Sequence, residues 1–296
     1  MSFQSGGNFK GGRVKRAGGG RSAGVAGGGL GIVVIALVAY FLGVDPALIE
    51  GALDNTGITG SGSGVSGYIG ACTAEQANTD RQCRLSATVQ ALDAYWTKTL
   101  PAQTNVKYTP PDVVSFDGQT QSRCGVASAA TGPFYCPADQ TIYVDVAFFD
   151  RLSSRYGASG GPLGEMYVVA HEMGHHIEYL IGALHEADND EGANSDSVRI
   201  ELEADCFAGM WAGGAATTVD PNTGTTFLEP ITQAQLKDAL SAAAAVGDDH
   251  IQKTQAGYVN PDTFTHGTSQ QRMNWFTTGY EKGKVASCDV LHAKNI

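Results

Sequence analysis

The stretch Val168–Leu180 (VVAHEMGHHIEYL) constrains this chain more than any other, because it carries His171, Glu172 and His175 in the order H-E-x-x-H. On a helix, residues three and four positions apart share one face. Both imidazoles can then bind one metal ion, with the Glu172 carboxylate beside it. The segment therefore predicts a helix that supplies part of a zinc site.

The chemistry of zinc explains this spacing. Neutral imidazoles are good zinc ligands, and a catalytic site needs only three protein ligands, which leaves the fourth position for water. Zinc lowers the pKa of that water, and a neighbouring carboxylate can take its proton, so Glu172 is the candidate base. Apolar residues on both sides of the motif predict a buried helix, in which Gly174 allows close approach of a backbone or a metal. We expect His176 to pack or hydrogen-bond near the site.

A third ligand is expected in Ser197–Trp211 (SVRIELEADCFAGMW), a strongly apolar predicted helix that contains three acids. A carboxylate in such surroundings is costly unless it binds a metal or a hydrogen-bond donor. Glu201 and Asp205 are four positions apart and share a face, whereas Glu203 is turned away. We expect Glu201 to bind zinc and Asp205 to accept a hydrogen bond from a ligand imidazole. Glu203 is expected to be solvated or salt-bridged, and the alternative makes Glu203 or Asp205 the ligand.

Charge is distributed unevenly along the 296 residues, of which 42% are hydrophobic. The chain carries a net charge of −11, yet residues 1–29 contain five basic residues and no acid. The remainder therefore carries −16, and so acidic a body argues against nucleic acid as a partner. The length allows one domain of ordinary size with an appendage.

Residues 1–29 form a Gly-rich basic tail that is not expected to order, because it holds too little apolar surface. Residues 30–49 follow as a predicted membrane anchor, since no residue from Ser22 to Val44 is charged. Basic residues before the anchor predict a cytoplasmic tail, with everything beyond the anchor outside the cytoplasm. A cleaved signal peptide and a buried core helix are the alternatives.

Beyond the anchor, residues 50–70 are a predicted Gly/Ser linker, and residues 71–296 are the predicted folded domain. Within that domain, Ala71–Leu100 fits a scaffold helix ended by Pro101. Residues 140–149 (QTIYVDVAFF) alternate in polarity, which is typical of a strand with one buried face.

Six cysteines fit an extracytoplasmic domain with disulfides. Cys124 and Cys136 bracket a short loop and are the natural first pair, and Cys72 with Cys83 is a second plausible pair. Cys206 and Cys288 are left over. Because six cysteines allow 15 pairings, the connectivity stays open.

The segments HEMGHHIE and RIELEADCFAGMW together resemble the bacterial neutral zinc metallopeptidase family of membrane-anchored proteins. The similarity extends to FLGVDP, FYCPADQTIYVDVAFF and THGTSQQRMNWFTTGY, and so covers nearly the whole chain. It implies an α+β, zincin-like metallopeptidase domain, mainly helical with a small sheet, preceded by one transmembrane helix. It also implies zinc-dependent peptide-bond hydrolysis, with the family motif falling on His171, Glu172, His175, Glu201 and Asp205.

Two further expectations come from zinc peptidases of the zincin type. An edge strand near the metal helix pairs there with the substrate backbone, and TIYVDVAFF could serve in this way. A side chain opposite the metal often stabilises the developing oxyanion. His266 is our candidate, with Arg272 behind it at the start of a predicted helix over Ser269–Tyr280. The DDH turn at residues 248–250 is expected to lie at the surface.

The sequence therefore favours a membrane-anchored extracytoplasmic zinc endopeptidase that acts on a peptide or protein, with Zn²⁺ as its cofactor. One alternative is a non-catalytic, zinc-stabilised domain that binds cell-envelope partners. Another is a cell-wall amidase that uses the same zinc site. The intact Glu172 argues against the first alternative, because metal retention alone needs no base.

Overall fold

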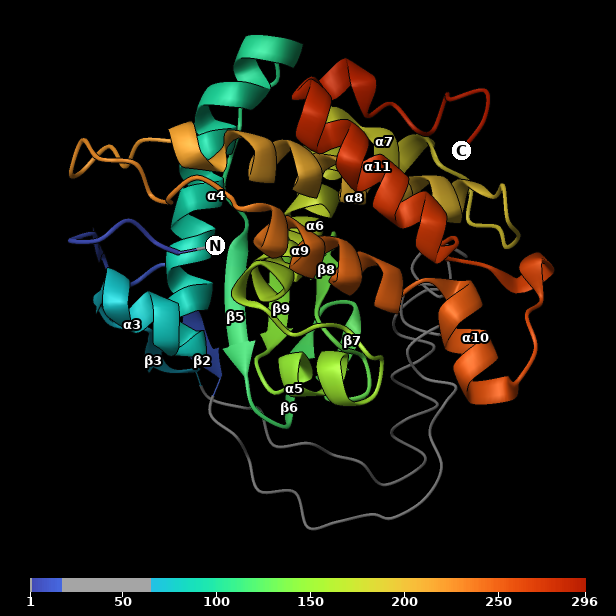
Figure 1. The fold of residues 1–296 in the computed structure, drawn as a ribbon, viewed down its shortest axis with the longest axis horizontal. Helices are drawn as coiled ribbons and strands as arrows, with labels where there is room; N and C mark the ends of the chain where they lie inside the picture. Colours follow the sequence, from blue (N-terminus) through green and yellow to red (C-terminus); the bar gives the residue numbers. More distant parts are fainter. Residues whose placement is uncertain (1, 18–64) are drawn as a thin grey trace.

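A computed structural model describes residues 2–17 and 65–296, in which strands and two helices form the N-terminal half and helices form the C-terminal half (Figure 1). The α-helices are α3 (Ala74–Thr79), α4 (Arg81–Thr104), α5 (Phe148–Ser154), α6 (Pro162–Ile181), α7 (Ala183–Glu186), α8 (Asp196–Gly214), α9 (Gln233–Ala245), α10 (Asp248–Ala256) and α11 (Ser269–Lys282). The strands are β1 (Asn8–Phe9), β2 (Lys15–Ala17), β3 (Val65–Tyr68), β4 (Cys72–Thr73), β5 (Asp112–Phe116), β6 (Gln119–Ser122), β7 (Gly125–Ser128), β8 (Phe134–Cys136) and β9 (Thr141–Asp145). The predicted α+β class is confirmed.

The largest sheet has five strands in the order β3-β2-β5-β9-β8. Strands β2, β5 and β9 are parallel to one another, while the outer strands β3 and β8 run antiparallel to their neighbours. We expected the segment that forms β9 to be a strand with one buried face, either an ordinary sheet strand or an edge strand that pairs with substrate. The predicted strand is confirmed, but all five of its residues are buried, and it lies between β5 and β8 as an ordinary inner strand. Of the two edge strands, β3 and β8, the neighbour of β9 is β8.

The long helix α4 differs from our prediction at both ends. It begins at Arg81, where the Asp80 side chain accepts a hydrogen bond from the backbone N–H of Cys83 at 2.8 Å. The preceding residues form the separate helix α3. The helix also continues past Pro101 to Thr104, because a proline in the last turn removes only one backbone hydrogen bond.

Residues 2–17 belong to the fold. Strand β2 pairs with β3 and β5, and β1 pairs with β4. The side chains of Phe3, Phe9 and Val14 are buried in the main hydrophobic core. We expected residues 1–29 not to order, and the structure differs for residues 2–17. Backbone pairing and three buried apolar side chains offset the entropy lost on ordering this Gly-rich segment.

The predicted anchor over residues 30–49 lies outside the described residues. Most of the predicted linker over residues 50–70 does too, although its last residues include β3. Among the helices of residues 2–17 and 65–296, none is long and apolar enough to cross a membrane. The anchor and the linker stay predictions.

All six cysteines form disulfides, as the sequence suggested. The pairs are Cys72–Cys83, Cys124–Cys136 and Cys206–Cys288. The first two close short loops, and the third connects α8 to the C-terminal segment across 82 residues. Such pairs are typical of proteins that fold in oxidising compartments, and the extracytoplasmic location of this domain stays a prediction.

Helix α6 lies between the sheet and the helices α8 and α9 (Figure 1). Glycines let the helices approach closely. A Cβ atom on Gly174 would lie 2.8 Å from the Cα of Ala204, so α6 and α8 cross at this pair. Helices α8 and α11 meet in the same way at Gly209 and Gly279, where an added Cβ would collide with the opposite backbone. These crossings set the spacing of the side chains on α6, α8 and α11.

Replacing Gly174 by alanine is expected to destabilise the fold by about 1–3 kcal/mol, because overpacking outweighs a gain of about 1 kcal/mol in helix propensity. The same change pushes α6 away from α8 and is expected to weaken zinc binding. Denaturant unfolding and zinc titration measure the two effects. A variant at least as stable as the wild type would contradict so close a crossing.

Candidate metal centre

Helix α6 carries the H-E-x-x-H motif in its middle. The helix begins with Pro162 in its first turn and ends at Gly182, whose φ of 95° is left-handed and favours glycine. Between these ends the backbone is regular, so His171 and His175 lie one turn apart on the same face. The centroids of their imidazole rings are 4.8 Å apart. This face is directed at α8.

Glu201 on α8 meets both imidazoles. Its carboxylate oxygens lie 3.1 Å from Nε2 of His171 and 3.6 Å from Nε2 of His175. A tetrahedral zinc with bonds of about 2.1 Å holds its ligand atoms about 3.4 Å apart. The observed separations agree with this value, and the three ligand atoms lie within 4.8 Å of one another. Two imidazoles and one carboxylate therefore fit a zinc ion.

Of the three side chains, Glu201 supplies the negative charge of the cluster. Burial raises the pKa of Glu201, but His266 and His175 overcome this and hold the pKa well below its usual range. Burial lowers the pKa of His175. Burial also lowers the pKa of His171, yet the carboxylates of Asp205 and Glu201 raise it to about 10. A bound metal takes the place of a ligand proton, so zinc binding and proton release are coupled.

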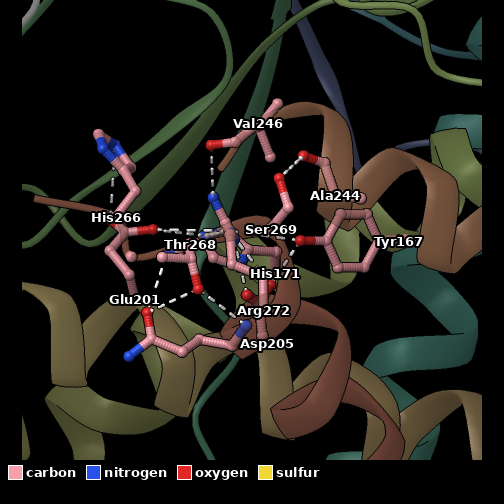
Figure 2. A network of polar contacts seen from close by, with 12 residues as sticks. Tyr167, His171, Glu201, Asp205, Ala244, Val246, His266, Thr268, Ser269 and Arg272 are labelled. Atoms are coloured by element: carbon pink, nitrogen blue, oxygen red, sulfur yellow. Dashed lines mark hydrogen bonds and ion pairs between the residues drawn. The ribbon is translucent and has the colours of Figure 1, made fainter. Parts of the chain in front are cut away.

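Asp205 lies where we expected an acid that orients a ligand. Its Oδ1 is 2.9 Å from Nδ1 of His171 and also accepts a hydrogen bond from the Tyr167 hydroxyl at 2.5 Å. Arg272, on α11, donates from Nε to Oδ2 of Asp205 at 2.7 Å (Figure 2). Although burial raises the pKa of Asp205, Arg272 and His171 hold it below the usual range. Three helices therefore fix the ring of His171.

The second imidazole has a carboxylate partner of its own, which sequence reasoning missed. Oε2 of Glu178 lies 2.8 Å from Nδ1 of His175, three residues earlier on α6. Burial, with the charge of Glu201 as a further cause, raises the pKa of Glu178 well above its usual range. In the sequence, this contact is indicated by the three-residue spacing of His175 and Glu178, which places both on one face of a helix.

Glu172, the candidate base, follows His171 directly and is buried. Burial raises its pKa, while the nearby His171 and His175 act in the opposite direction. A carboxylate with a raised pKa is a stronger base than an exposed one. Glu172 is therefore a buried carboxyl group next to the candidate ligands, with a pKa raised by burial.

His266 approaches the same site from the loop before α11. Its side chain is 40% exposed, and its Nε2 lies 4.0 Å from Oε1 of Glu201 (Figure 2). Asp248 holds this loop: one of its oxygens accepts backbone N–H groups of residues 265, 266 and 267 at 2.6–3.0 Å. Burial lowers the pKa of His266, but Glu201 and Asp248 raise it above the usual value. Our expectation that residues 248–250 form a mere surface turn is wrong, because Asp248 is buried.

Two other residues singled out in the sequence lie outside the ligand cluster. Glu203 is buried on another face of α8, where its Oε2 accepts a hydrogen bond from the backbone N–H of Val290 at 3.1 Å. Burial, with Glu178 as a further cause, raises the pKa of Glu203 to about 9. We had expected Glu203 to be solvated or salt-bridged. That expectation is wrong, because Glu203 is buried and its partner is a backbone N–H. His176 is buried and hydrogen-bonds the carbonyl oxygen of Thr109 at 2.7 Å, so it packs beside the site.

A family model described as "Putative neutral zinc metallopeptidase" matches residues 4–291, which is nearly the whole chain. The chain belongs to this family. The match begins inside the N-terminal segment that forms β1 and β2, and it includes α6, α8 and the His266 loop. The three side chains that fit a metal in this structure thus lie in a family whose description names zinc.

Two similar proteins carry the description "uncharacterized". An uncharacterized protein of Mycobacterium tuberculosis (strain H37Rv) is 45% identical over 261 residues, which covers 87% of this chain and 86% of the relative. The uncharacterized protein YpfJ of Escherichia coli (strain K12) is 41% identical over 190 residues, or 62% of each chain. No solved structure gives a significant match.

Proposed function

We propose that the protein is a zinc-dependent endopeptidase with a zincin-like site. The observation that carries the proposal is the cluster of His171, His175 and Glu201, with Glu172 next to it on α6. Two imidazoles and one carboxylate form the ligand set of catalytic rather than structural zinc sites. When bound, zinc polarises the substrate carbonyl and makes water more acidic.

Glu172 supplies the base in this proposal. Its carboxylate takes a proton from the attacking water, and the protonated acid then donates to the leaving nitrogen. Burial of Glu172 favours both steps, because it raises the pKa toward the pH at which proton uptake and release are both accessible. A site that merely retains zinc has no use for such a residue.

His266 is the proposed oxyanion partner. Contact with carboxylates raises its pKa, so a protonated Nε2 is available to donate a hydrogen bond. The ring is partly exposed beside Glu201, and the loop that carries it is held by Asp248. A fixed donor is worth more than a mobile one, because no reorganisation is needed when charge develops on the substrate oxygen.

Strand β8 is the proposed pairing edge for an extended peptide. It lies at the end of the five-stranded sheet and packs against α6, the helix that carries both histidine ligands. Strand addition binds a substrate mainly through its main chain, which suits a peptidase that accepts unstructured protein. From the sequence, the segment of β9 was only one candidate for this role.

Removing the metal tests the function. A chelator is expected to reduce cleavage of an unstructured protein to background, and one equivalent of zinc is expected to restore it. Cleavage is followed by gel electrophoresis and mass spectrometry of the peptides. Activity that survives complete zinc removal would contradict the proposal. Cleavage of peptidoglycan fragments but of no protein would instead favour the amidase reading.

A further inference from the structure

Glu178 is a buried acid on α6 that the proposed reaction does not use. It lies one helical turn beyond His175, and its side chain is 0% exposed. Oε2 lies 2.8 Å from Nδ1 of His175. In the part of the chain that the structure describes, the other oxygen, Oε1, has no hydrogen-bond partner.

Such a carboxyl group needs a physical reason. Burial of a carboxylate is strongly unfavourable unless hydrogen bonds or opposite charges compensate it. No arginine or lysine forms an ion pair with Glu178 among the described residues, and His175 is the partner that its side chain reaches. An apolar residue would fill this position of a buried helix at lower cost. The buried carboxyl group therefore points to a function at His175.

The two histidine ligands are supported in the same way. Nδ1 of His171 faces Oδ1 of Asp205 at 2.9 Å, and Nδ1 of His175 faces Oε2 of Glu178 at 2.8 Å. In both rings the Nδ1 atom is engaged by an acid, while the Nε2 atom is directed at Glu201. A hydrogen bond from an acid to one ring nitrogen fixes the orientation of the ring and leaves the other nitrogen free to bind a metal.

The two supports differ in how they are held. Arg272 and Tyr167 bind Asp205 in addition to the imidazole, so three side chains from α6 and α11 fix that acid. Glu178 lies on the same helix as the ring that it contacts and is held by packing. Its effect on His175 is therefore separable from the Arg272 network, and changes at Glu178 leave that network in place.

We propose that Glu178 is a positioning residue, whose hydrogen bond to Nδ1 fixes the ring of His175 so that Nε2 faces Glu201, and which thereby strengthens metal binding. The inference rests on the proposed function, because it requires a metal between His171, His175 and Glu201. It adds a residue on which the affinity of the site depends, although that residue touches neither the metal nor the substrate.

The experiment compares the wild-type chain with Glu178→Met, which removes the hydrogen bond at similar length, and Glu178→Gln, whose amide oxygen can still accept from Nδ1. Glu165→Gln is the matched control, because Glu165 is a buried acid on the same helix that pairs with Arg84 and contacts no ligand. Zinc affinity is measured by competition with a chelator. The visible spectrum of the cobalt-substituted protein reports ligand geometry, and thermal unfolding without metal reports a purely structural effect.

Glu178→Met is expected to bind zinc about 10–100-fold more weakly than the wild type and to alter the cobalt spectrum. Glu178→Gln is expected to recover most of the affinity, and Glu165→Gln to keep all of it. Unchanged affinity and spectrum in Glu178→Met, with zinc bound by the wild type, would overturn the role of Glu178 alone. So would a loss confined to thermal stability without metal. A wild-type chain that binds no zinc would overturn the proposed function and this inference together.

Discussion

Glu172→Gln is expected to lose hydrolysis of an unstructured protein by about 10²–10⁴-fold while it still binds one zinc ion per chain. The amide has nearly the shape of the carboxylate but cannot accept a proton from water. The three proposed ligands are untouched, so metal content and folding should match the wild type. The measurements are the initial rate of cleavage, zinc content after gel filtration, and the midpoint of thermal unfolding.

Zinc content is the internal control of this comparison, because a variant that had lost its metal would be inactive for another reason. Equal activity of the two proteins would contradict the assignment of Glu172 as base. If both bind zinc and neither cleaves any member of a broad peptide library, the binding-domain reading gains over the peptidase.

Phe9→Ala is expected to destabilise the whole domain by about 3–5 kcal/mol, although residue 9 belongs to the Gly-rich N-terminal segment. The Phe9 side chain is buried, and its ring stacks on that of Phe227 with centroids 6.0 Å apart. The ring of Phe3 packs edge-on against the ring of Phe9, with centroids 5.0 Å apart. Truncation leaves a cavity between β1 and the segment before α9. Denaturant unfolding of the full chain measures the loss.

The neighbouring Lys10 gives the matched control. Its side chain is exposed, and its ammonium donates a hydrogen bond to the side-chain oxygen of Asn222 at 2.6 Å. Lys10→Ala is expected to change the stability by less than about 0.5 kcal/mol. If Phe9→Ala were as harmless as Lys10→Ala, residues 2–17 would not be part of the folded domain.

The candidate site could be predicted where helical spacing alone decides which side chains meet. His171 and His175 share a face of α6, and Glu201 and Asp205 share a face of α8, whatever surrounds these helices. Glu178 also lies within reach of His175 by spacing. Whether it turns to the imidazole or to solvent depends on what covers α6, and that is a property of the tertiary packing.

Two parts of the fold were hidden for the same reason. The alternation in Thr141–Asp145 predicts one buried face, but β9 is covered on both faces and paired on both edges, and local polarity does not report such neighbours. The Gly-rich composition of residues 2–17 predicts a disordered tail, because composition reports nothing about distant partners. Burial of Phe9 depends on Phe227, a partner more than two hundred positions away in the chain.

The pairing of β2 with β3 limits how the chain can be arranged across a membrane. Ala17 at the end of β2 and Val65 at the start of β3 are partners in the ladder. Strands that pair occupy one compartment, so residues 17 and 65 lie on the same side of any bilayer. The basic residues of the tail, taken alone, place that tail opposite the domain. The arrangement that we expected from the sequence, a cytoplasmic tail with one crossing before the domain, therefore does not fit the pairing of β2 with β3.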